Sequence, residues 1–558
     1  MRHTTEADEK RTLRAKLSHP DVGHVGEGNL TFGYSCSATF SLNAFAPQVR
    51  LTAAQLAEGL VAEAEDGSKW SLFGCKGFGH SLLIDFVAEN GMQAARIQKF
   101  EVRYSDVSDW FFPQMRLDEE LGAKIEWTSM PAQLVAEVAQ PDLNFKCESY
   151  YYASFVQRGE DRNLHQHFEF HFTATRDRFT LAGVRDLARQ FSQLISLLLA
   201  HPCSIVSIDV MPDGVYGGRL YYGVSKSPTP PAEKTDDPGY IGWRAFFADK
   251  DNVDPCWDDV VKKFFGSEHR DVVWARLASL QTFEGFWEYR ILGYVTLLDR
   301  YVSTNIKKGP SVRPTTRKLK RLEAALTGMK SVLTPSQTTE ILDAVAGLFS
   351  STETFESRFE GLVASLDKNV IQVINFHPHD FERIKELRDE VAHGLEISYK
   401  SSDLTQMLSI MHRLVLLLTY LFFLEVGLGT DIFLRCLDRT RSELRLRADI
   451  DKVHLHRVLR PETFFRVSPG ELEVIRKRPR KLFAPCFVLD EQGGISYSLE
   501  YSQRLQDTIS DKIGGHAYER LGLPSEATRH VGEAYFEDGA NVESIHSVVM
   551  IDCSLLPT

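Results

Sequence analysis

Arg388, Asp389 and His393 are the residues whose types and spacing most clearly suggest chemistry. They lie within residues 381–397, which read FERIKELRDEVAHGLEI. An imidazole exchanges protons near neutral pH, whereas a guanidinium stays charged and can hold a phosphate through two parallel hydrogen bonds. A carboxylate four residues before the histidine can accept an imidazole N–H and fix its tautomer. These three side chains would therefore place an oriented proton carrier beside a phosphate clamp.

Helical periodicity predicts how these groups are presented. At 100° per residue one apolar stripe forms, and it comprises Phe381, Ile384, Leu387, Val391 and Leu395. His393 lies almost opposite this stripe, and Arg388 lies at its border. Asp380 is well placed as the N-cap. We therefore expect a helix that packs on a bundle and turns His393 outward.

Two other pairs in the chain have the same spacing, Arg14/His19 and Arg162/His167. The first pair lies in a charged N-terminal segment with no sign of a helical bundle. The second lies in an alternating run typical of a strand, where residues five apart point to opposite faces. Only the pair that begins at Arg388 combines this spacing with a helical setting.

Composition limits the class of protein. With 558 residues the chain exceeds one ordinary core, so two to four domains are expected. A net charge of −12 argues against a protein that coats nucleic acid with its whole surface. The eight cysteines are scattered singly, which predicts neither a disulfide framework nor a structural zinc site. No phosphate loop, serine-hydrolase elbow or zinc-protease helix motif occurs.

Two features predict a cytoplasmic protein without a membrane segment. The N-terminus is charged and lacks the apolar core of a signal peptide. The most apolar run, residues 414–424, is shorter than the roughly 20 residues that span a bilayer. We interpret this run as a buried helix of a bundle.

The pattern along the chain predicts an α+β protein. Residues 1–27 form an N-terminal segment, and residues 28–225 read mainly as strands with one helix between them. Residues 226–253 are rich in Pro, Lys and Asp, so we interpret them as a linker. Residues 254–428 are helical throughout, and residues 429–558 form a mixed, basic C-terminal region.

A basic run in the C-terminal region could grip an RNA backbone, and its residues are Arg476, Lys477, Arg478, Arg480 and Lys481. Acidic neighbours such as Glu471 and Glu473 make a solvated, salt-bridged surface an equally good interpretation.

One strand in residues 164–172 carries its polar residues on a single face, and these are His165, His167, Glu169 and His171. Such a face is most often the wet side of an antiparallel sheet, so we predict no metal site and no cofactor. A divalent metal site or a surface that recognises a protein trigger are the alternatives.

The motif at Arg388 and His393, with a polar residue after the arginine, resembles the R-x4-H motif of HEPN-domain ribonucleases. The layout of a β-rich region, a helical region ending near RDEVAH and a very apolar following helix resembles the ApeA group of anti-phage proteins. This resemblance implies a metal-independent endoribonuclease that works as a homodimer of its HEPN domain. Arg388 would bind the scissile phosphate, His393 would act as general base or acid, and Asp389 would orient it.

The resemblance also implies products, partners and an alternative. The expected products carry a 2′,3′-cyclic phosphate and a 5′-hydroxyl. RNA cleavage, with tRNA as one candidate substrate, would arrest an infected cell in response to a phage-derived trigger. The alternative is a catalytically silent HEPN module that binds RNA or scaffolds a dimer without cutting.

Overall fold

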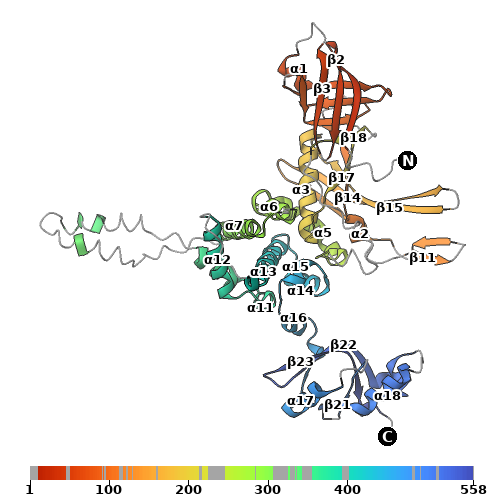
Figure 1. Cartoon of the computed structure of the whole chain (residues 1–558), viewed down its shortest axis with the longest axis vertical. Coiled ribbons are helices and arrows are strands. Elements are labelled where there is room, and N and C mark those ends of the chain that lie inside the picture. The colour runs from red at the N-terminus through yellow and green to blue at the C-terminus, as the bar shows by residue number, and fades with distance from the viewer. Residues whose placement is uncertain are drawn as a thin grey trace. The chain divides into compact units, whose positions relative to one another are not determined.

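In the computed structural model the chain forms two compact units, Met1–Ile450 and Asp451–Thr558. The structure describes residues 10–556 except for residues 35, 46–50, 79, 91, 93–95, 112–116, 121–123, 128–129, 159–160, 213–216, 224–245, 283–284, 306–323, 327–333, 335, 338, 342–354, 393–400, 480–483, 491 and 511–514. The first unit is a large antiparallel sheet followed by helices, and the second is a small mixed domain (Figure 1). The chain is therefore an α+β protein.

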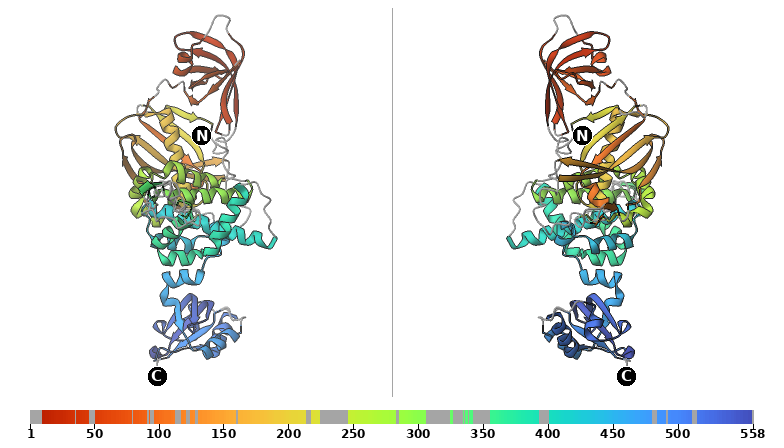
Figure 2. Two further views of the ribbon diagram at one scale, coloured as in Figure 1. Left: turned by 90° about the vertical axis from the view of Figure 1, so that its left-hand side faces the viewer. Right: turned by 90° about the vertical axis from the view of Figure 1, so that its right-hand side faces the viewer.

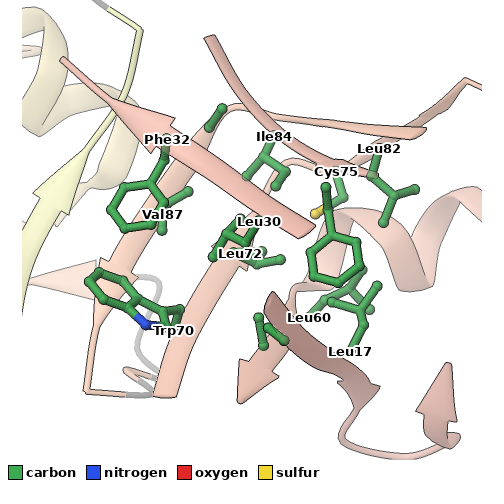
Figure 3. Packing of buried hydrophobic residues seen from close by; sticks show 14 of the residues in the cluster. Leu17, Leu30, Phe32, Leu60, Trp70, Leu72, Cys75, Leu82, Ile84 and Val87 are labelled. Carbon is green, nitrogen blue, oxygen red and sulfur yellow. The ribbon is translucent and has the colours of Figure 1, made fainter. Parts of the chain in front are cut away.

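The first part of the sheet has eight strands and is strongly curled, and one short helix accompanies it (Figure 2). They are β1 (Arg11–His19), β2 (Gly23–Gly33), β3 (Cys36–Phe45), α1 (Ala53–Glu58), β4 (Leu60–Ala64), β5 (Lys69–Phe73), β6 (Lys76–Phe78), β7 (Ser81–Ile84) and β8 (Phe86–Glu89). Their order in the sheet is β8-β5-β4-β1-β2-β3-β7-β6. Figure 3 shows the core that they enclose, in which Leu17, Leu30 and Leu72 are completely buried.

The sheet begins earlier than the expected boundary at residue 28. β1 starts at Arg11 and pairs along its length with β2. Ala15 and Leu17 face the core, while Lys16 between them is exposed. The sequence contains the alternation that is typical of a strand. The charged residues on the outer face led to the interpretation of these residues as a segment outside the sheet.

The second part of the sheet has the order β13-β14-β15-β10-β17-β18 and joins the first part where β18 pairs with β8. Its strands are β10 (Lys99–Tyr104), β13 (Val135–Ala139), β14 (Asn144–Arg158), β15 (Asp161–Ala174), β17 (Ile205–Met211) and β18 (Gly218–Tyr221). Smaller elements beside it are β9 (Arg96–Ile97), α2 (Val107–Phe111), β11 (Leu117–Glu120), β12 (Lys124–Trp127) and β16 (Phe179–Thr180).

One long helix, α3 (Leu181–Leu199), covers one face of this second part (Figure 1). Its Phe191 packs edge-on against Phe170 and Phe172 of β15, with ring centroids 4.8 and 5.0 Å away. The hydroxyl of Thr180 accepts the backbone N–H of Gly183 and so begins the helix. The opposite face of β15 carries polar residues.

The helical region follows, and α12 and α13 are its most relevant members. The helices are α4 (Lys250–Val253), α5 (Trp257–Gly266), α6 (Ala275–Gln281), α7 (Trp287–Asn305), α10 (Phe355–Ser365), α11 (Lys368–Ile374), α12 (Pro378–Ala392), α13 (Ser401–Glu425), α14 (Thr430–Arg439) and α15 (Glu443–Arg447). Two shorter turns, η3 (Asp254–Cys256) and the π-helical η4 (Arg270–Trp274), lie between α4 and α6. α7 contacts α10, α12 and α13.

The apolar helix α13 is a core element. Leu404–Glu425 is long and apolar enough to cross a membrane, yet 83% of its most apolar window is buried inside the protein. Burial of this kind is what the core helix of a soluble protein shows, as the sequence predicted for residues 414–424.

Both expected borders of the helical region differ from the structure. Phe246 and Phe247, placed by the sequence in a linker of residues 226–253, are buried, and Phe247 packs against Phe423 and Phe433. The first unit also extends to Ile450, beyond the expected border at residue 429. α14 and α15 have an apolar stripe that packs on α13. Their many arginines led us to assign them to the basic C-terminal region.

The second unit is a mixed five-stranded sheet with the order β19-β22-β23-β20-β21 and helices around it. Its elements are α16 (Lys452–Leu459), η5 (Pro461–Thr463), β19 (Phe464–Arg466), α17 (Pro469–Lys477), β20 (Cys486–Leu489), β21 (Ile495–Ser498), α18 (Leu499–Ser510), α19 (Ala517–Leu521), η6 (Ser525–Ala527), β22 (Thr528–Glu537), β23 (Val542–Asp552) and η7 (Cys553–Leu555). α17 buries Leu472 and Ile475 against Phe487 and Phe536.

Candidate functional site

The helix α12 carries Arg388 and Asp389, and the described helix ends at Ala392. His393 lies outside the described residues. Phe381 and Ile384 are only 4% and 2% exposed, so the N-terminal half of the predicted stripe faces the core. The rest of the stripe, from Leu387 onward, has no described side chain.

Asp380 is not the N-cap that the sequence predicted, because the helix begins two residues earlier at Pro378. Its carboxylate instead reaches back and accepts the backbone N–H of His377 at 3.0 Å. The acidic side chain still satisfies a free N–H at the start of the helix, but from within the first turn.

Asp380 also forms a buried ion pair with Arg413 of α13, at 2.8 Å. The two side chains are 6% and 9% exposed. Arg413 donates a second hydrogen bond to the carbonyl oxygen of Ala448 at 2.8 Å and lies 3.3 Å from the carboxylate of Asp449. One guanidinium therefore ties the start of α12 to α13 and to the end of the first unit. No pattern in the sequence pointed to this pair.

Aromatic packing fixes α12 against α10. Phe381 stacks on Phe359 with ring centroids 4.3 Å apart and the rings within 8° of parallel. Phe355 also packs on Phe381, at 5.0 Å. The guanidinium carbon of Arg388 lies 6.0 Å from the centre of the Phe355 ring, at the outer limit of a cation–π contact. The same ring thus holds the helix and supports Arg388.

Among the described residues, no carboxylate lies at ion-pairing distance from the half-buried Arg388. Glu386, a potential helical partner, is paired with Arg383 at 3.0 Å. Asp389 is exposed and precedes His393 by four residues in the sequence. The guanidinium can therefore bind an anion such as a phosphate.

The basic run lies at the end of α17, and its described members have acidic neighbours. Arg476 and Lys477 lie 3.3 and 3.7 Å from Glu473. Arg478 lies 3.2 Å from Glu543 of β23. Arg480 and Lys481 lie outside the described residues. The described part of this run is thus a surface of mixed charge.

The polar face of β15 is organised together with β10. Glu101 of β10 is the direct cross-strand partner of His171. The His171 Nε2 lies 3.2 Å from a Glu101 oxygen and 3.0 Å from the Tyr152 hydroxyl. His167 Nε2 lies 2.9 Å from Glu169. The side chain of His165 is not described.

Burial dominates the electrostatics of this polar face. It lowers the pKa of His171 to about 4, assisted by the positive charge of Lys99. Burial also raises the pKa of Glu101, although the hydrogen bond and charge of Lys99 oppose it, and the carboxylates of Glu169 and Asp209 add a smaller increase. The sequence had singled out the histidines, but nothing local indicated Glu101, because only the strand register brings it there.

Comparison with known families gives a match in the β-rich part of the chain. Residues 61–254 match the model described as ApeA N-terminal domain 1, which covers roughly a third of the chain. No curated protein and no solved structure matches the chain. The matched region contains the polar face of β15, whereas α12 lies beyond it. The match shows that this part of the chain is similar to that domain.

Proposed function

We propose, on the premise that the match to ApeA N-terminal domain 1 identifies an anti-phage defence protein, that the helical region is a HEPN endoribonuclease. It would cut RNA without a metal ion and so arrest the infected cell. The substrate would be an RNA used in translation, with tRNA as the first candidate. A phage-derived trigger would release this activity in the cytoplasm.

The proposed reaction uses three residues in stated roles. Arg388 binds the scissile phosphate and stabilises the charge that develops on it. His393 removes the proton of the 2′-hydroxyl or protonates the leaving 5′-oxygen, and Asp389 holds its imidazole in one tautomer. Attack of the 2′-oxygen on phosphorus yields a 2′,3′-cyclic phosphate and a 5′-hydroxyl. Two copies of this helix would face each other in a homodimer.

The observation that carries the proposal is the environment of Arg388. Its guanidinium lies over Phe355 and has no carboxylate partner among the described residues. A solvated surface arginine would more commonly pair with the acidic residues that crowd this helix, as Arg383 does with Glu386. An arginine that lies over a ring and has no carboxylate partner among the described residues is suited to binding phosphate.

The test measures cleavage of total RNA and of tRNA by the full chain in EDTA. Arg388→Ala and His393→Ala should each abolish cleavage and toxicity while the circular dichroism spectrum stays unchanged. Arg383→Ala and His379→Ala are the matched controls, because they remove an arginine and an exposed histidine from the same helix. Both controls should cut RNA at the rate of the unaltered protein.

The outcome can contradict the proposal in two ways. Full cleavage by Arg388→Ala or His393→Ala would exclude the assigned roles. A 3′-phosphate that forms without a cyclic intermediate, or a 5′-phosphate, would exclude attack by the 2′-hydroxyl.

A catalytically silent HEPN module is the second candidate, and the mixed charge of the run at Arg476, Lys477 and Arg478 bears on it. If the chain only binds RNA, affinity should fall steeply with salt and should depend on this run. Lys477→Ala is the most informative change, because the Lys477 side chain is 80% exposed. Binding that depends on Lys477 without any cleavage would favour the silent module.

A further inference from the structure

We propose that Glu101, Glu169 and His171 form a binding site for a divalent transition-metal ion on the polar face of β10 and β15. The site lies in the β-rich region and does not rest on the proposed nuclease activity. Zn²⁺ is the ion that we use to define it.

The strand register gathers the three ligands. Glu101 and His171 are direct partners on adjacent antiparallel strands, and Glu169 lies two residues before His171 on the same face. One ligand atom from each residue lies within 4.8 Å of the other two. Ligands at these separations can converge on one ion after small rotations of the side chains.

Burial and stacking hold the ligands in place. The side chains of Glu101, Glu169 and His171 are 13%, 14% and 5% exposed. Tyr150 stacks on the imidazole of His171, with ring centroids 4.0 Å apart. Phe170, the residue between the two β15 ligands, is fully buried on the opposite face. The ligands therefore stand on a rigid, packed sheet.

The chemistry of the three groups favours a cation. Two carboxylates and one imidazole are ligands that Zn²⁺ and Mn²⁺ accept. Two partly buried carboxylates repel each other, and without an ion they are compensated by Lys99, 3.0 Å from Glu101, and by Arg103, whose charge interacts with Glu169. A divalent ion would hold both carboxylates directly and would replace the hydrogen bonds that His171 Nε2 makes to Glu101 and Tyr152.

Binding of an ion requires the imidazole proton of His171 to move from Nε2 to Nδ1. In the structure Nε2 lies 3.2 Å from the Glu101 carboxylate, which accepts its hydrogen bond. Nδ1 is buried and has no hydrogen-bond partner among the described residues, so no donor there opposes the move when an ion takes the Nε2 lone pair.

A second group of potential ligands provides the contrast. His19, Asp21 and Glu58 also bring ligand atoms within 4.8 Å of one another. There, however, the Nδ1 of His19 accepts the backbone N–H of Asp21 at 3.1 Å. Asp21 and Glu58 are also exposed, so solvent screens the charges of both carboxylates. We therefore assign the metal site to the first group and not to this one.

The experiment measures bound zinc in the untagged full chain after equilibrium dialysis against ZnCl₂ and gel filtration. The unaltered protein should retain one more equivalent per chain than Glu101→Gln or Glu169→Gln, with affinity at least about 100-fold weaker in the variants. Glu58→Gln is the matched control and should retain as much zinc as the unaltered protein. Circular dichroism verifies that the variants fold.

The same experiment can overturn the proposal. Less than one equivalent in the unaltered protein would exclude the site without reference to any variant. Equal retention by the unaltered protein and a folded Glu101→Gln or Glu169→Gln variant would assign the zinc elsewhere, for example to cysteines. RNA plays no part in this measurement, so a failure to bind zinc would leave the nuclease proposal intact. Likewise, a failure to cut RNA would leave the proposed metal site intact.

Discussion

Arg413→Met should loosen the helix that carries Arg388, because Arg413 is the buried link between α12 and α13. The change removes an ion pair to Asp380 at 2.8 Å and a hydrogen bond to the Ala448 carbonyl at 2.8 Å. Methionine keeps part of the packing volume but leaves the Asp380 carboxylate buried without its cation. Removing one partner of a buried pair typically costs about 3–5 kcal/mol.

An exposed ion pair between α12 and α10 provides the control. Lys385 lies 3.0 Å from Glu356, but these side chains are 47% and 43% exposed. An exposed pair contributes at most about 1 kcal/mol, so Lys385→Met should have little effect. The double variant Asp380→Asn/Arg413→Met should cost clearly less than the sum of its two single changes, since no buried charge is left alone.

Hydrogen exchange of the α12 amides is the appropriate assay, because a chain with two compact units does not unfold in one step. A loss of about 3–5 kcal/mol corresponds to protection factors roughly 100- to 5,000-fold lower in α12. The reasoning fails if Arg413→Met lowers protection no more than Lys385→Met does. It also fails if the costs of the Asp380 and Arg413 variants are simply additive.

Three further outcomes follow from single contacts. Burial lowers the pKa of His412 to about 4. Below pH 6.5 the unfolded chain therefore binds more protons than the folded chain. The free energy of unfolding should then fall by at most about 1.4 kcal/mol per pH unit between pH 6.5 and 4. Thermal midpoints measured across this range should fall less steeply for His412→Gln. Phe355→Leu removes the ring beneath Arg388 and should slow the proposed RNA cleavage about 2- to 10-fold in a single-turnover assay; an unchanged rate would show that the ring is dispensable. Gly28→Ala would press a methyl group against the carbonyl oxygen of Ser41, where β2 pairs with β3, and should cost about 1–3 kcal/mol; an unchanged melting temperature by circular dichroism would contradict this.

The sequence was informative wherever the structure depends on residues close together in the chain. The apolar stripe of α12 was visible because residues three and four apart share one face of a helix, and Phe381 and Ile384 are buried as expected. The prediction of where this helix starts was less accurate. Asp380 can act from the N-cap or from the first turn, and its buried partner Arg413, which favours the observed position, lies 33 residues away.

The polar face of β15 shows why the rest of a site is invisible in one sequence. Alternation placed His167, Glu169 and His171 on one face, because the period of a strand is a local property. Glu101 joins them only because β10 pairs with β15 in one register, and a shift by a single residue would turn it to the opposite face. That register is set by the buried side chains of both strands, including Phe100 stacked on Phe172 at 4.8 Å. A site on one helix can thus be predicted from spacing, whereas a site shared between strands requires the core that fixes their pairing.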